Sequence, residues 1–102
     1  IARGVAVETI QNNINLIADL CEFHKIKLVP ASVLPVHDYN KAQNPAFEMT
    51  KRRPMETIAA LNRWLQAFAQ QRGLLYLDYS GAMMDEKGFL KADLADDGLH
   101  PN

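Results

Sequence analysis

The fold class follows from residues 54–78, which read PMETIAALNRWLQAFAQQRGLLYLD. The first part predicts a helix, because Pro54 suits a first helical turn and Gly73 suits a C-terminal cap. The apolar stripe of this helix consists of Ile58, Leu61, Leu65 and Phe68. Leu74–Asp78 is then a continuous apolar run ending in an acid, which is typical of a buried parallel strand. A helix followed by such a strand predicts the α/β class.

The preceding half of the chain repeats this order of elements. From about Val5 to His24 the apolar residues fall at helical spacing, and Ile26–Ser32 reads as a short strand that Pro30 ends or distorts. Val33–Arg53 is a long polar loop, a kind that is often functional. Two parallel strands alone would leave open edges and a thin core. We therefore expect about half of a doubly wound α/β domain, with both ends of the chain cut.

Composition excludes several classes of function. The chain has 102 residues and a net charge of −1, so neither nucleic acid nor an anionic membrane is indicated as a partner. Lys51–Arg53 is a local basic cluster, which suits either a solvated corner or a phosphate site. No apolar run is long enough for a membrane span. No metal-ligand spacing or glycine-rich phosphate loop is present, so no cofactor or metal is predicted. The compartment stays open.

The last six residues, Asp97–Asn102, carry the strongest indication of chemistry. They read DGLHPN and place a carboxylate three positions before a histidine. Asp97 can accept a hydrogen bond from one ring nitrogen of His100, which fixes the tautomer and leaves the other nitrogen for a nucleophile. In an open α/β sheet, ligands bind outside the carboxyl ends of the strands, where this segment is expected. The alternative is a plain Asp-Gly turn followed by a surface histidine.

Other candidate residues are weaker. His37 and Asp38 follow the first predicted strand and form a pair that either contacts substrate or is structural. Ser32 and Ser80 are the only serines, and neither lies in a G-x-S-x-G turn. Both are expected to be hydrogen-bonding loop residues. The chain therefore offers a base without a nucleophile.

The chain resembles the SGNH/GDSL hydrolase superfamily in four segments that keep one consistent order. Asp97–Asn102 looks like that family's last conserved block. Leu28–Pro35 resembles its strand-plus-proline segment, and Asn62–Leu65 and Tyr76–Tyr79 resemble the helix and strand that follow. Ile1–Arg3 looks like the sequence just after the family's asparagine block.

This resemblance implies a flavodoxin-like three-layer α/β/α fold with a parallel sheet, of which residues 1–102 are the incomplete C-terminal portion of one domain. It implies ester hydrolysis or acyl transfer on a small-molecule ester, with His100 as general base and Asp97 as its orienting acid. The family's G-D-S, glycine and asparagine blocks are absent, so the chain alone is expected to be inactive. The alternative function is a non-catalytic α/β module that assembles through its open sheet edge with another copy or another chain.

Overall fold

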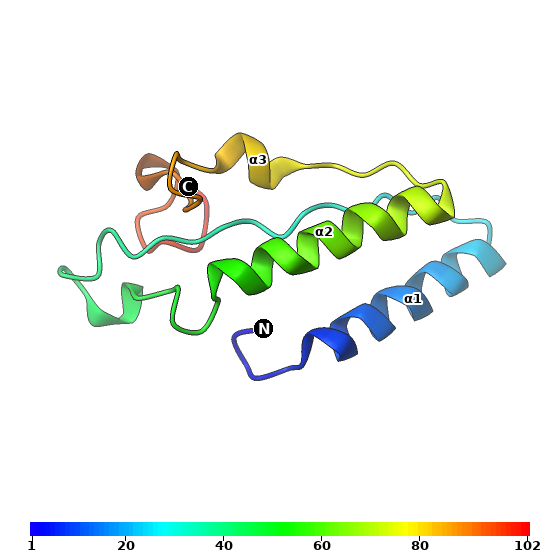
Figure 1. Ribbon diagram of the computed structural model, residues 1–102, viewed down its shortest axis with the longest axis horizontal. Helices are drawn as coiled ribbons and strands as arrows, with labels where there is room; N and C mark the ends of the chain where they lie inside the picture. The colour runs from blue at the N-terminus through cyan, green and yellow to red at the C-terminus, as the bar shows by residue number, and fades with distance from the viewer.

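The computed structural model describes residues 1–102 as an elongated body of 48 × 27 × 21 Å. Two long helices, α1 (Val7–Phe23) and α2 (Met55–Arg72), lie side by side and point in the same direction (Figure 1). Two extended segments run back in the opposite direction, one after each helix. The remaining elements are the short helix α3 (Tyr79–Met83) and the 3₁₀ turns η1 (Pro45–Phe47) and η2 (Ala92–Leu94).

Both predicted helices are confirmed, with ends within two residues of those expected. Gly73 caps α2 in the left-handed conformation with φ +67°, where a residue without Cβ is least strained. Arg72 joins the C-terminal ends of the two helices, because its guanidinium lies 2.8 Å from Asp19 and 3.7 Å from Glu22 of α1. The shared direction of the helices brings these ends together.

The two predicted strands meet at one point only. Ala31 and Leu77 form a single parallel bridge, in which Leu77 donates to Pro30 O at 2.9 Å and accepts from Ser32 N at 2.9 Å. The other residues of 26–32 and 74–78 are extended without regular pairing. A parallel sheet of several strands is therefore not present within residues 1–102. The physical reason is that each segment has a partner on one side at most, and ladders this short are marginal.

A side chain of α2 pairs with the backbone of the residue that follows the first predicted strand. The Asn62 amide donates to Val33 O at 2.8 Å and accepts from Val33 N at 2.7 Å. A neighbouring strand would offer the same donor and acceptor to the peptide groups of this residue. Asn62 thus fixes the position of the first extended segment along α2.

The core contains residues of α2, one residue of α1, and residues of the chain after each extended segment. Its fully or nearly fully buried apolar residues are Ala18, Val36, Ile58, Leu61, Leu65, Phe68, Ala69, Leu90 and Ala95. By contrast, α1 buries only Ala18, and its Leu16, Leu20 and Phe23 are exposed by 61%, 59% and 80%. These three side chains form an apolar stripe along α1, which we call the outer face of α1. None of the helices has the length and hydropathy of a membrane-spanning segment.

Candidate active site

The Asp97–His100 segment forms a compact turn that Asp97 itself organises. One carboxylate oxygen, Oδ1, accepts from the backbone N–H groups of Leu99 and His100, both at 2.8 Å. The other oxygen, Oδ2, lies 2.6 Å from Nδ1 of the His100 ring. The backbone bonds hold the carboxylate in place, so its second oxygen is presented to the imidazole. The pairing predicted from the D-x-x-H spacing is therefore present in the structure.

Electrostatics and exposure suit this pair to proton transfer. The hydrogen bond from His100, together with the two backbone N–H groups, lowers the pKa of Asp97 from 3.8 to about 2. Asp97 is thus ionised at neutral pH and accepts the Nδ1 proton. The His100 side chain is 78% exposed, and its Nε2 makes no hydrogen bond. A ring oriented at one nitrogen and open at the other can accept a proton from a neighbouring hydroxyl.

The turn packs closely on the segment that follows the first extended stretch. His37 donates its backbone N–H to Gly98 O at 3.0 Å. Gly98 has φ +85°, and a Cβ at this position would lie 2.1 Å from His37 O. Only glycine fits such an approach with this backbone conformation. The turn therefore lies beyond the C-terminal end of the extended segment, the side expected for a ligand site in this class of fold.

His37 does not face a substrate site. Its side chain is fully buried, and its ring nitrogens bond to backbone groups of Ala95 and Tyr39. Of the two interpretations of His37, the structure supports a structural role and not a contact with substrate. Its burial could have been anticipated from the apolar residues Val33–Val36 directly before it, of which Pro35 and Val36 are buried. The contact with Ala95, 58 positions later, has no signal in the sequence.

Asp38 organises the long loop. It accepts hydrogen bonds from Met49 N at 2.6 Å, from Thr50 N at 2.9 Å and from the Thr50 hydroxyl. Burial raises the pKa of Asp38, but the hydrogen bonds outweigh burial, and the pKa lies below its usual value. Asp38 thus closes the segment between 38 and 50 into a loop and does not pair with His37.

The two serines are used in packing. Ser32 Oγ accepts a hydrogen bond from Ser80 N at 2.8 Å, and both residues are buried. This contact ties the end of the first extended segment to the start of α3. Their hydroxyls are therefore poor candidates for a nucleophile, as the sequence indicates.

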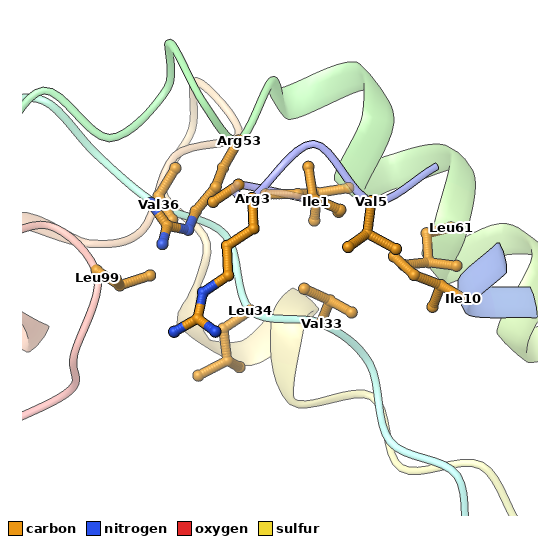
Figure 2. Close-up of a pocket in the computed structure, with 12 residues that line it drawn as sticks. Ile1, Arg3, Val5, Ile10, Val33, Leu34, Val36, Arg53, Leu61 and Leu99 are labelled. Atoms are coloured by element: carbon orange, nitrogen blue, oxygen red, sulfur yellow. The ribbon is translucent and has the colours of Figure 1, made fainter. Parts of the chain in front are cut away.

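A largely apolar cavity of about 560 Å³ adjoins the Asp97–His100 turn, because Leu99 forms part of its wall (Figure 2). Its other walls come from the N-terminal residues, the segment after the first extended stretch, and α2. Arg3 and Arg53 are the only charged residues among its lining. A second hollow of about 510 Å³ shares Leu99 and Arg53 and includes Lys51 and Arg52. The basic cluster therefore lies near the turn that carries His100.

No group of three or more His, Cys, Asp or Glu side chains is arranged to hold a metal ion. The only acid–histidine contact is the one between Asp97 and His100.

Comparisons with known proteins find two similar solved structures. The chain is similar to a GDSL-like lipase from Bacteroides thetaiotaomicron, with 26% identity and a TM-score of 0.75 over 97% of the chain. It is also similar to a protein classed as an acylhydrolase from Bacteroides fragilis, with 25% identity and a TM-score of 0.80 over 97% of the chain. It spans 46% and 45% of those two structures, about half of their length. None of the curated protein sequences matches it.

The sequence profile of the GDSL-like Lipase/Acylhydrolase family matches residues 1–102, the whole of the chain. The family predicted from the DGLHPN segment and the three upstream segments is therefore confirmed. The chain belongs to the GDSL-like lipase/acylhydrolase family.

Proposed function

We propose that this chain is the C-terminal portion of a serine ester hydrolase domain, in which His100 is the general base and Asp97 orients it. The observation that carries the proposal is the 2.6 Å contact between Asp97 Oδ2 and His100 Nδ1 with the opposite ring nitrogen free. This is the arrangement that ester hydrolysis by a hydroxyl nucleophile requires.

The chemistry proceeds in two stages. The oxygen of a serine hydroxyl attacks the acyl carbon while His100 Nε2 takes the hydroxyl proton. The alcohol then leaves with that proton. A water molecule then attacks the acyl-enzyme, again giving its proton to Nε2, and the acid and the free serine are released. Asp97 stays ionised throughout and stabilises the imidazolium. Ser32 and Ser80 are engaged in packing, so the nucleophile belongs to a segment outside residues 1–102.

Three observations support the proposal that these residues are part of a larger domain. The structural relatives are about twice as long as the chain. The predicted sheet is reduced to one bridge between Ala31 and Leu77. The outer face of α1 leaves large apolar side chains in solvent. A flavodoxin-like sheet with further strands beside residues 26–32 would complete both the sheet and this helix layer.

The substrate we propose is a small-molecule ester whose apolar portion occupies the cavity in Figure 2. Leu99 lines that cavity and is the neighbour of His100 in the chain, so an acyl or alkyl group held there would place its ester bond near the base. Mostly apolar walls with a few polar groups are typical of small-ligand sites.

The test is hydrolysis of nitrophenyl acetate and nitrophenyl butyrate by the intact protein and its His100→Ala variant. We expect kcat/KM to fall by at least about 10³-fold, because the serine loses its base. His24→Ala is the matched control, since His24 is an exposed histidine at the end of α1, and it should keep the wild-type rate. Wild-type activity in the His100→Ala variant would overturn the assignment of the base.

A further inference from the structure

His37 is the only ionisable side chain that is fully buried, and the proposed reaction does not use it. The two hydrogen bonds of its ring show which ring nitrogen carries the proton. The backbone N–H of Tyr39 can only donate, so His37 Nδ1, 3.1 Å away, is the acceptor. The carbonyl oxygen of Ala95 can only accept, so Nε2, 2.6 Å away, carries the proton. The ring is therefore neutral, with a single tautomer.

These bonds clamp the turn that carries the Asp97–His100 pair. The ring holds Ala95 O, two residues before Asp97, and the backbone N–H of His37 holds Gly98 O, one residue after it. Asn40 adds a third contact, because its amide donates to Asp96 O at 2.9 Å. Three carbonyl groups of residues 95–98 are thus held by residues 37 and 40.

The clamp matters because the turn makes few other hydrogen bonds to the rest of the molecule. Residues 95–102 form no helix or strand. The bonds of Asp97 lie within its own turn and do not attach it to the body of the molecule. The only further hydrogen bonds run from Asn102 to Leu94 O and Asp93 O. The hydrogen bonds that place the His100 ring relative to the rest of the domain therefore come mainly from His37 and Asn40.

We propose that His37 is a positioning residue, which holds the Asp97–His100 pair in place through the bond from its Nε2–H to Ala95 O. The role in catalysis rests on the proposed function. Misplacing a catalytic group by about 1 Å can cost about 10²-fold in rate. Loss of this bond should therefore lower kcat, with a smaller rise in KM, because His37 does not line the cavity but Leu99 of the same turn does.

Two substitutions separate the two ring nitrogens. His37→Gln places an amide N–H near the position of Nε2 and keeps the donor to Ala95 O. His37→Asn places an amide oxygen near Nδ1, so it keeps the acceptor for Tyr39 N and loses the donor. In the intact protein, we expect kcat to fall by about 10²-fold in His37→Asn and by less than about 10-fold in His37→Gln. Equal kcat values for folded His37→Gln and His37→Asn would overturn the proposal.

A second readout does not depend on activity. The backbone amide of His100 should be well ordered in ¹⁵N relaxation measurements on ¹⁵N-histidine-labelled protein, because the bonds from His37 and Asn40 attach its turn to the body of the molecule. We expect this order in the wild type and in His37→Gln, and greater mobility of the amide in His37→Asn. Unchanged order in folded His37→Asn would overturn the proposal. If the wild type shows an ordered turn but hydrolyses no ester, the proposed function fails while the positioning role of His37 is still tested.

Asn40→Ala covers the case in which His37→Asn does not fold. It removes the contact with Asp96 O from a partly exposed site, where truncation is tolerated. We expect a fall of several-fold in kcat that exceeds any change in KM. No change in either kcat or the order of the His100 amide would count against the clamp.

Discussion

At the scale of single residues, Asp97 has two tasks that involve different oxygens. Oδ1 shapes the turn through Leu99 N and His100 N, and Oδ2 holds the imidazole. An asparagine at this position would keep a carbonyl oxygen for the turn while losing the charge. The two tasks can therefore be separated by one substitution.

This separation predicts a pH dependence for Asp97→Asn. The folded-state pKa of Asp97, about 2, lies below its ordinary value of 3.8, so the ionised carboxylate stabilises the folded protein above that ordinary value. This contribution is lost as the pH falls through the folded-state pKa. In urea denaturation, the difference between wild type and Asp97→Asn should be constant near neutral pH and should disappear between about pH 4 and pH 2.

We expect that difference to be below about 1 kcal/mol, because the His100 partner is largely exposed. A difference that grows on acidification would contradict the contact between Asp97 and His100.

How far the sequence alone predicts the site also depends on the individual residue. The spacing of Asp97 and His100 is local, and a local turn brings them together, so the pair was predictable. The role of His37 depends on its contact with Ala95, and a contact between segments so far apart in sequence follows only from tertiary structure. The serine nucleophile is not predictable from these residues in any way, because neither Ser32 nor Ser80 fits the role.

At the scale of elements, the helices were predictable because their apolar periodicity and the Gly73 cap are local signals. The strands were not, since the pairing of an extended segment depends on neighbours that lie elsewhere in the sequence. Asn62 shows the consequence, because a helix side chain, 29 positions away in the sequence, satisfies the backbone of Val33 just after the predicted strand.

Asn62→Ala should therefore destabilise the protein by about 1–3 kcal/mol, because both backbone groups of Val33 lose their partners. The matched control is Gln66→Ala, an exposed position one turn further along α2, which should change stability by less than about 0.5 kcal/mol. Chemical denaturation measures both. Equal effects of the two substitutions would show that the bonds to Val33 contribute nothing.

At the scale of the whole molecule, substitutions on the outer face of α1 test whether other parts of the intact protein cover that face. If it is covered in the intact protein, replacing both Leu16 and Leu20 with Lys buries two charges. We expect a loss of at least about 3 kcal/mol in unfolding free energy. The control is the double replacement of Gln66 and Gln70 with Lys on α2, which adds the same charges at the same spacing on exposed positions.

Two outcomes would contradict the proposed covering by the rest of the domain. If Leu16→Lys/Leu20→Lys is tolerated as well as the control, the face is open to solvent in the intact protein. If the destabilisation depends on protein concentration, a second copy covers the face, which is the assembly expected for a non-catalytic module.

The amide of Asn62 also limits where a further strand can pair with the first extended segment. Peptide groups of an extended chain alternate in direction, so Pro30 O and Ser32 N point to Leu77, while those of Val29, Ala31 and Val33 point to the opposite edge. On that edge the groups of Val29 and Ala31 have no hydrogen-bond partner, whereas Asn62 already occupies those of Val33. A further strand can therefore pair with Val29 and Ala31 and must separate from this segment at Val33. The side chain of Asn62 thus sets the point where the two chains separate and a crevice opens.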